Sequence, residues 1–262
     1  MGRVLAIACL FFALLVPAAS GVDSCRGHPV TIDGTRDGDN IQGTPGDDVI
    51  SGGPGADRIH GLGGRDVLCG GGGADLLDGG DGDDLVFGGE GGDTIDGGTG
   101  DDVLSGEEAN DGLTGGAGFD VVRYGRAPSA VIVDLKDGTA SARSGGGTGA
   151  DTILEVEGAY GSSFDDLLIA GPEGSFLVGN RGADEAIGGP GPDRIFGGQG
   201  RDDLIGRLGP DELTGDDGAD RMRGSGGADA LIGGSGNDIV DGGKGRDDCD
   251  GGPGDDRFID CD

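Results

Sequence analysis

Aspartate recurs at every ninth position through most of the chain, and this spacing indicates metal chemistry. In the stretch 70–105, four copies of one nine-residue unit follow without a gap: GGGGADLLD, GGDGDDLVF, GGEGGDTID and GGTGDDVLS. Each copy has Gly at positions 1, 2 and 4, Asp at position 6 and an aliphatic residue at position 8. Because calcium accepts carboxylate and backbone carbonyl oxygens in flexible arrangements, the repeated Asp and the glycine turns predict calcium sites.

The spacing also predicts how the carboxylates are stacked. If two copies make one coil of 18 residues, each Asp lies above the Asp two copies earlier. Neighbouring strands lie roughly 4.8 Å apart, which would bring Asp75 near Asp93 and Asp84 near Asp102. Two ladders of bare carboxylates would repel one another, and divalent cations between them would remove that repulsion.

The remaining positions of the unit predict the elements that hold the Asp. Three glycines among four residues indicate a turn with backbone conformations that a Cβ would hinder. The triplet around position 8, such as 76–78, favours a short strand whose middle residue points to one side. One such turn and strand cannot bury a core alone, but stacked copies form a thin continuous one. The predicted fold class is therefore all-β.

The pattern GGxGxDxUx resembles the calcium-binding nonapeptide of RTX (haemolysin-type) repeat proteins. The resemblance implies a parallel β-roll, which is a β-solenoid, with calcium bound between successive turns on both sides. It also implies that the position-6 Asp side chains and the turn carbonyls are the metal ligands.

The copies form two arrays. The first array, 34–123, holds ten copies, and the second, 161–262, holds eleven copies and a C-terminal cap. Position 6 is Asp in all but one of them, where Ser175 predicts the weakest site. With sites between copies n and n+2, the ceiling is about 17 calcium ions. The predicted metal ligands are Asp39, Asp48, Asp57, Asp66, Asp75, Asp84, Asp93, Asp102, Asp111, Asp120, Asp166, Asp184, Asp193, Asp202, Asp211, Asp220, Asp229, Asp238, Asp247 and Asp256.

Residues 124–160 break the nine-residue period and separate the arrays. The run 130–135 and the segment 151–156 are strand candidates, with a loop predicted at 144–149 between them. We expect this interlude to add strands to the roll without forming a separate globule, and a linker between two domains is the alternative. Residues 21–33 form an N-terminal lead-in.

The composition supports cation binding and argues against polyanionic partners. The chain has 262 residues, of which 66 are Gly, and 50 acidic against 18 basic residues give a net charge of −32. Such a charge disfavours nucleic acid and anionic membrane surfaces. An acidic disordered chain is the alternative, but a periodic apolar position fits it poorly. The thin core and the self-repulsion together predict that calcium binding is coupled to folding.

Residues 1–20 have the features of a secretory signal peptide. Arg3 supplies positive charge, 4–16 is an apolar run too short to span a membrane, and small residues precede a cleavage site before Gly21. Secretion is therefore expected, although RTX proteins usually carry a C-terminal export signal. A lipoprotein anchored at Cys25 is an alternative, which Asp23 and the distance from the apolar run disfavour.

Four cysteines remain after this cleavage: Cys25, Cys69, Cys249 and Cys261. An even number in an exported protein suggests disulfide bonds. A Cys249–Cys261 bond could tie down the last coil and cover its open edge, and Cys25–Cys69 could do the same at the start. Alternatively, Cys249 is simply a small core residue. Zinc is disfavoured because the chain has no Cys-x-x-Cys pair.

The sequence indicates a calcium-binding protein without catalysis. We find no His-Glu-x-x-His zinc motif, Gly-x-Ser-x-Gly elbow, phosphate-binding loop or EF-hand. An alternative is a surface adhesion or matrix protein that presents outward residues at positions 7 and 9 to a carbohydrate or protein partner. Residues at such positions include Arg58, His60, Arg194 and Phe196. A carbohydrate-active enzyme is a further alternative, although regularly spaced carboxylates favour metal over an acid pair.

Overall fold

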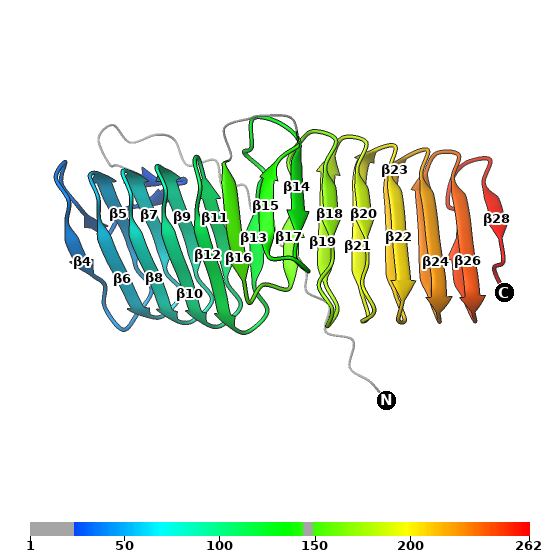
Figure 1. Cartoon of the computed structure of the whole chain (residues 1–262), viewed down its shortest axis with the longest axis horizontal. Coiled ribbons are helices and arrows are strands. Elements are labelled where there is room, and N and C mark those ends of the chain that lie inside the picture. The colour runs from blue at the N-terminus through cyan, green and yellow to red at the C-terminus, as the bar shows by residue number, and fades with distance from the viewer. Residues whose placement is uncertain (1–23, 144–148) are drawn as a thin grey trace.

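The chain folds into an elongated parallel β-roll (Figure 1). The computed structural model describes residues 24–143 and 149–262, and every regular element in these residues is a β-strand. The chain winds back and forth between two facing sheets, one of fourteen strands and one of twelve. The prediction of an all-β parallel roll is confirmed. No helix that could cross a membrane occurs in the described part of the chain.

The fourteen-stranded sheet contains every second strand of the two arrays and, between them, the consecutive strands β14, β15 and β16. Its strands, in spatial order, are β28 (Arg257–Ile259), β26 (Ile239–Gly245), β24 (Arg221–Gly227), β22 (Asp203–Leu208), β20 (Glu185–Ile187), β18 (Leu167–Ile169), β14 (Val131–Asp134), β15 (Thr139–Ala142), β16 (Ala150–Leu154), β12 (Gly112–Ala117), β10 (Thr94–Thr99), β8 (Leu76–Asp81), β6 (Arg58–Gly63) and β4 (Asn40–Gln42).

The twelve-stranded sheet holds the intervening strands. They are, in spatial order, β27 (Asp248–Asp250), β25 (Ala230–Ser235), β23 (Glu212–Gly218), β21 (Arg194–Gly200), β19 (Phe176–Arg181), β17 (Gly158–Tyr160), β13 (Val121–Arg123), β11 (Val103–Glu107), β9 (Leu85–Glu90), β7 (Val67–Gly72), β5 (Val49–Pro54) and β3 (Ile32–Asp33). A separate hairpin consists of β1 (Ser24–Cys25) and β2 (His28–Pro29).

Strands in the arrays pair with the strand two units along the chain, in the register that a coil of 18 residues requires. In the pair β8–β10, Leu77 lies opposite Ile95 and Asp78 opposite Asp96. Many strands are longer than the predicted triplet, because pairing resumes beyond position 1 of the next copy, as at Gly80 and Gly98. The expected three-residue strands are therefore wrong for much of the arrays.

The core is a thin file of position-8 side chains between the two sheets. Side chains such as Leu77, Val86 and Ile95 are fully buried, and they belong to one cluster that runs through both arrays. Ile41 and Cys249, at position 8 near the two ends of the roll, are partly buried. Phe258, at position 8 of the last copy, is 49% exposed.

The interlude continues both sheets of the roll. Strand β16 pairs with β12 of the first array, and β17 joins β13, the last strand of that array, to β19 in parallel register. Strands β14 and β15 form an antiparallel hairpin between β16 and β18. The core cluster passes through this region by way of side chains such as Tyr124, Val133 and Ile153. These strands therefore pack on the same core as the two arrays. Of the predicted loop at 144–149, residues 144–148 lie outside the described residues.

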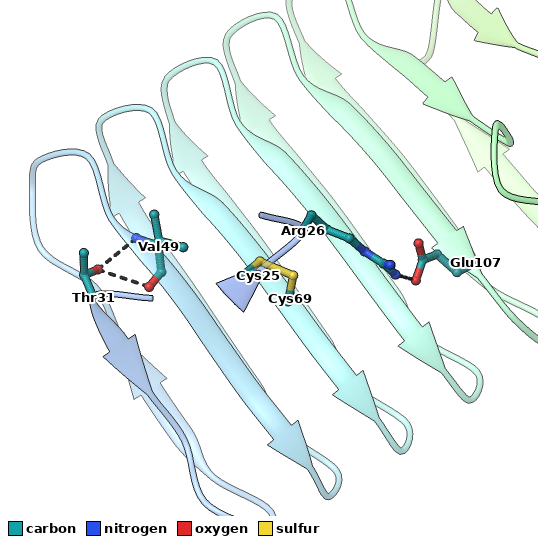
Figure 2. The surroundings of a disulfide bond; sticks show 6 residues. All are labelled: Cys25, Arg26, Thr31, Val49, Cys69 and Glu107. Atoms are coloured by element: carbon teal, nitrogen blue, oxygen red, sulfur yellow. Dashed lines mark hydrogen bonds and ion pairs between the residues drawn. A yellow bond between two sulfur atoms is a disulfide. The ribbon is translucent and has the colours of Figure 1, made fainter. Parts of the chain in front are cut away.

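The lead-in crosses the twelve-stranded sheet near its N-terminal end (Figure 2). A disulfide joins Cys25 to Cys69 on β7, with the two Cα atoms 5.8 Å apart. Arg26 next to it forms an ion pair with Glu107 and lies over the ring of Phe87. The disulfide therefore fastens the hairpin to β7, and Arg26 extends the contact to β9 and β11. Strand β3 remains the edge strand. The disulfide therefore does not cover the edge of the sheet, contrary to the prediction from the sequence. The predicted signal peptide, 1–20, and residues 21–23 lie outside the described residues.

A second disulfide closes the C-terminal end of the roll. Cys249 on β27 bonds to Cys261, with Cα atoms 6.0 Å apart. Both cysteines pack against the core cluster, and the Cys261 Sγ lies 3.8 Å from the carbonyl oxygen of Val240. The last three residues therefore fold over one side of the core.

Candidate metal sites

The position-6 side chains form two columns that run along the roll. Column 1 precedes the strands of the fourteen-stranded sheet, and column 2 precedes those of the twelve-stranded sheet. Every predicted ligand lies in one of them. Column 1 consists of Asp39, Asp57, Asp75, Asp93, Asp111, Asp151, Asp166, Asp184, Asp202, Asp220, Asp238 and Asp256. Column 2 consists of Asp48, Asp66, Asp84, Asp102, Asp120, Glu157, Ser175, Asp193, Asp211, Asp229 and Asp247.

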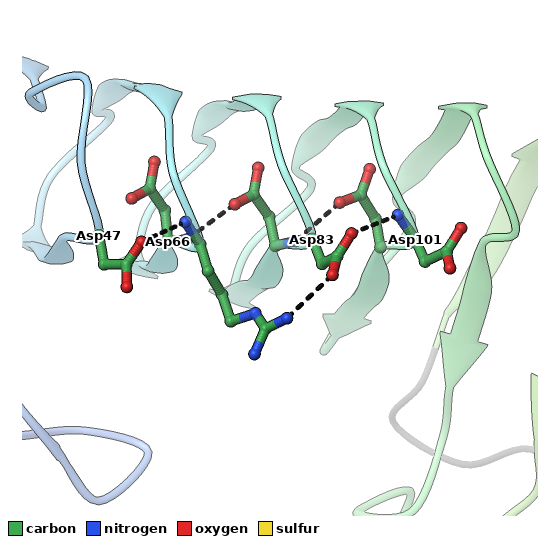
Figure 3. A network of polar contacts seen from close by, with 7 residues as sticks. Asp47, Asp66, Asp83 and Asp101 are labelled. Atoms are coloured by element: carbon green, nitrogen blue, oxygen red, sulfur yellow. Dashed lines mark hydrogen bonds and ion pairs between the residues drawn. The ribbon is translucent and has the colours of Figure 1, made fainter. Parts of the chain in front are cut away.

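Neighbouring carboxylates in a column are connected through the backbone. The amide of Asp75 donates a hydrogen bond of 2.8 Å to Oδ1 of Asp93, and the amide of Asp84 does the same to Asp102. Figure 3 shows this arrangement in the first array. It recurs at 2.7–3.0 Å along both columns. Most column carboxylates therefore receive one strong donor from a backbone amide of the preceding coil, which the sequence did not predict.

The second carboxylate oxygen, Oδ2, is left buried and without a hydrogen-bond partner in fourteen of the column aspartates. A buried charged oxygen without a partner is strongly unfavourable, and a divalent cation is the partner that suits a row of them. The residues that fit a metal in this way are Asp57, Asp66, Asp75, Asp84, Asp93, Asp102, Asp111, Asp120, Asp184, Asp202, Asp211, Asp220, Asp229 and Asp238.

Backbone carbonyl oxygens lie close to these orphaned atoms because position 1 is Gly. A Cβ added to Gly70 would collide with Oδ2 of Asp75 and would lie 2.6 Å from the carbonyl oxygen of Gly88. The same two kinds of oxygen face the position-1 residue at Gly79 and Gly97. Carboxylate and carbonyl oxygens are the donors that calcium prefers, so the donor set fits that ion.

The columns do not bring many acidic side chains to one point. No group of three His, Cys, Asp or Glu side chains lies close enough for a metal within residues 24–143 and 149–262. A site here would therefore take one or two carboxylates and complete its shell with backbone carbonyls and water.

Burial makes the metal-free carboxylates hard to ionise. Desolvation raises the pKa of Asp84, Asp93 and Asp184 to about 7, with the neighbouring carboxylates adding to the rise. The pKa of Asp102 and of Asp111 rises to about 6 for the same first reason. Hydrogen bonds from the backbone oppose these shifts without cancelling them. A bound cation would reverse them, because it favours the ionised form.

Some column residues are already bonded by other groups of the protein. The amide and hydroxyl of Thr35 donate hydrogen bonds to Oδ2 of Asp39 at 2.6 and 2.9 Å. The amide and hydroxyl of Thr44 donate to Oδ2 of Asp48 at the same distances. The Gly189 amide donates to Oδ2 of Asp193 at 2.6 Å. In the one repeat copy of the arrays without Asp at position 6, the Ser175 hydroxyl accepts a hydrogen bond from the Gly171 amide at 3.0 Å.

Two column residues, Asp151 and Glu157, were missed by the sequence analysis. The amide of Asp111 donates to Oδ1 of Asp151 at 3.0 Å, and the amide of Asp120 donates to Oε2 of Glu157 at 2.9 Å. The available signal for Asp151 was the segment GGTGADTIL at 146–154, which keeps all the conserved positions of the unit. This copy is out of phase with both arrays, and its isolated position in the interlude hid the match. No such unit surrounds Glu157.

A second row of acidic side chains, at position 5 of the unit, runs alongside column 2 in the first array. Asp83 accepts a hydrogen bond from the Asp101 amide at 3.1 Å, and its other oxygen pairs with Arg65 at 2.9 Å (Figure 3). These side chains are exposed. They are therefore solvated surface charges, whereas the orphaned Asp oxygens of the described residues all belong to columns 1 and 2, which are the inner rows.

The outward residues considered for a partner surface contact their neighbours along the roll. Arg194 lies 3.1 Å from Glu212, and His60 Nδ1 lies 2.9 Å from Asp78. The Phe196 ring packs against Phe176 with centroids 5.5 Å apart. The Arg58 side chain lies on β6 and is exposed.

Comparison with known families agrees with these columns. The chain matches the model of the RTX calcium-binding nonapeptide repeat, which spans four copies, at residues 33–68, 63–95, 87–122, 160–195, 178–213, 196–231 and 223–258. The matches cover both arrays and leave out the interlude. The comparison with curated proteins finds no match.

Proposed function

The chain belongs to the family of RTX calcium-binding nonapeptide repeat proteins, and on this premise we propose that it is a secreted, non-catalytic calcium-binding protein that folds when calcium binds. The fourteen orphaned Oδ2 atoms carry the proposal. They are buried, they recur every nine residues through much of each array, and no group in the described residues donates a hydrogen bond to them.

The column aspartates and the turn carbonyls would hold the ions. Calcium would supply positive charge and Lewis acidity to oxygen atoms that otherwise repel one another. The position-6 Asp side chains of both arrays bind, and the glycines at position 1 leave space for their Oδ2 atoms. We expect about 14 ions, below the ceiling of about 17 that repeat counting gives, because several column residues are already bonded.

Folding is coupled to calcium because the metal-free roll concentrates charge around a thin core. The net charge is −32, and such self-repulsion destabilises a compact state. Each ion that binds the folded state and not the unfolded state stabilises the folded state by mass action. Affinity is expected in the range of extracellular modules, with Kd on the order of 10⁻⁴ to 10⁻³ M.

Circular dichroism tests this coupling. The chain in excess chelator should lack the strand signal, and calcium should restore it over the millimolar range, whereas magnesium at the same concentration should not. Magnesium is the informative control because it demands near-octahedral geometry and dehydrates reluctantly. An undiminished strand signal in chelator would contradict calcium-coupled folding.

Secretion is part of the proposal and is supported by the features of residues 1–20 and by two disulfides, which persist in oxidising compartments. The Cys25–Cys69 bond favours a free secreted chain over a lipoprotein, because the same sulfur cannot also carry a lipid. N-terminal sequencing of the exported protein should begin at Gly21. A chain that starts at a modified Cys25 would support anchoring instead.

A second candidate function is adhesion through one face of the roll. It is favoured by a row of rings on the twelve-stranded sheet, where Tyr160, Phe176 and Phe196 lie with centroids 5.7 and 5.5 Å apart. Aromatic rings suit sugar faces and apolar protein surfaces alike. Pull-down on polysaccharide in calcium, with Phe196→Ala beside the parent chain, would reveal such a partner. Equal recovery of both chains would argue against this face.

A further inference from the structure

Column 1 is interrupted in the middle of the roll. The antiparallel strands β15 and β14 separate β16 from β18, so Asp151 ends one half of the column and Asp166 begins the other. Neither residue has an orphaned oxygen, and the same holds for Glu157 and Ser175 in column 2. All orphaned column oxygens lie at or before Asp120, or at or after Asp184.

Asp166 is saturated by groups of the protein. Its Oδ1 accepts hydrogen bonds from the Val131 amide and from the Ser162 hydroxyl, both at 2.7 Å. Its Oδ2 accepts one from the Ser162 amide at 2.5 Å and one from the same hydroxyl at 3.0 Å. The carboxylate is fully buried. Asp184, the next residue of column 1, has the same amide bond at Oδ1, but its Oδ2 has no partner.

A fixed positive charge lies beside Asp166. The Arg143 Nη1 donates to the carbonyl oxygens of Asp165 and Asp166 at 3.0 and 3.1 Å. Its own amide donates to the Ala130 carbonyl at 2.7 Å, which anchors the residue at the end of β15. The guanidinium thus binds turn carbonyls in the way that a metal ion binds oxygen, and its charge opposes the rise in the pKa of Asp166.

Asp151 is satisfied by a tyrosine in place of a cation. The Tyr124 hydroxyl donates to Oδ2 of Asp151 at 2.8 Å, and both side chains are buried. The Asp111 amide donates to Oδ1, so both oxygens of this carboxylate have partners.

We propose that the middle of the roll is a calcium-free joint, in which Arg143, Ser162 and Tyr124 do for Asp166 and Asp151 what calcium does elsewhere. The proposal rests on the proposed function, because it distinguishes these two aspartates from others that need an ion. The two arrays then share no ion across the joint, and they load calcium as separate units.

The first experiment counts calcium ions by native mass spectrometry on the full mature chain and on two matched variants. Asp166→Asn and Asp184→Asn make the same change in neighbouring residues of one column. We expect Asp166→Asn to keep the parent's ion count and Asp184→Asn to lose at least one ion. Loss of an ion from folded Asp166→Asn would overturn the joint while leaving the proposed function intact. A parent chain without bound calcium would overturn the proposed function, and the joint with it.

The second experiment tests Arg143 directly and does not depend on the folding of Asp166→Asn. Hydrogen exchange of the β18 amides is measured in saturating calcium for Arg143→Met, Arg143→Lys and the control Arg201→Met. Arg201 is exposed. Arg143→Met should accelerate exchange roughly tenfold, because it removes the charged donor from the carbonyl oxygens of Asp165 and Asp166. Arg143→Lys should restore much of the protection. Equal exchange in Arg143→Met and Arg201→Met would overturn the assigned role.

Discussion

The backbone amide of Asp84 donates a 2.8 Å hydrogen bond to Oδ1 of Asp102, while Oδ2 of Asp102 is buried without a partner. This relationship repeats along both columns: the backbone bonds one oxygen of the carboxylate, and the other oxygen is available to a metal ion. The backbone fixes the position and spacing of each carboxylate. The remaining oxygen needs a cation, which explains how a chain of such charge can pack its Asp residues inside.

Replacing one inner carboxylate should weaken calcium binding, whereas replacing an outer one should not. Asp102→Asn removes a buried orphaned oxygen with its charge, and Asp101→Asn removes the same charge from an exposed neighbour. We expect Asp102→Asn to raise the calcium concentration at the folding midpoint several-fold, consistent with about 1–3 kcal/mol for a buried charged group. Calcium titrations followed by circular dichroism compare the two. Equal midpoints for the two variants would contradict the assignment of the column aspartates as calcium ligands.

The turn glycines should differ sharply in their tolerance of a side chain. Gly73 has φ of +133°, and a Cβ there would collide with the Gly55 carbonyl oxygen, whereas a Cβ on Gly72 would meet only a Glu90 oxygen at 3.8 Å. Gly73→Ala should therefore destabilise the calcium-loaded roll by about 1–3 kcal/mol, and Gly72→Ala should be close to neutral. Denaturant unfolding in saturating calcium measures both. An unchanged free energy of unfolding for Gly73→Ala would show that the turns at Gly73 and Gly55 do not pack as closely as the structure indicates.

Acidification should stabilise the metal-free roll. Burial raises the pKa of Asp84, Asp93, Asp211 and Asp220 from 3.8 to about 7. Between these values the folded chain binds more protons than the unfolded chain, so its stability falls as pH rises. The stabilising effect is complete below pH 3.8 and is lost as pH rises through about 7. In chelator, strand signal should therefore increase from pH 8 to pH 5. A signal that stays flat or decreases would show that these carboxylates are not buried without metal.

Calcium affinity should change with pH in the opposite direction, because only ionised carboxylates bind the metal. In the roll that is already folded, lowering the pH from 8 to 6 should raise the calcium concentration needed for half-saturation. Calcium binding to this folded roll near pH 6 should release protons, because its metal-free carboxylates are then partly protonated. Isothermal titration in two buffers of different ionisation enthalpy measures that release. Identical heats in the two buffers would contradict the raised pKa values.

The two disulfides should contribute unequally to stability. Cys25–Cys69 spans 44 residues and Cys249–Cys261 spans 12. Loop-closure entropy predicts losses of about 4 and about 3 kcal/mol when each pair is replaced by Ser. The first pair also positions Arg26 on Glu107, so its removal should free the hairpin as well. Unfolding in saturating calcium compares the variants, and a larger effect at the C-terminal pair would contradict this order.

The sequence predicted the roll and both columns because every copy repeats the same local pattern. Position 8 predicted the buried file represented by Leu77 and Ile95, and position 6 predicted carboxylates in register. It did not predict Asp151, because the copy that holds it is out of phase with both arrays, or Glu157, because the glycines of the unit are absent around it. It also could not predict the bonds of Tyr124 and Arg143, which depend on how the β14–β15 hairpin packs. The same holds for the lead-in, whose contacts with Glu107 and Phe87 join segments far apart in the chain.

The most direct test counts calcium ions on the purified mature chain by native mass spectrometry as calcium is raised into the millimolar range. The account predicts about 14 ions per chain, which corresponds to the orphaned oxygens of the two columns, and removal of all of them by chelator. A chain that takes up no calcium, or only one or two ions, while keeping its strand content would contradict it.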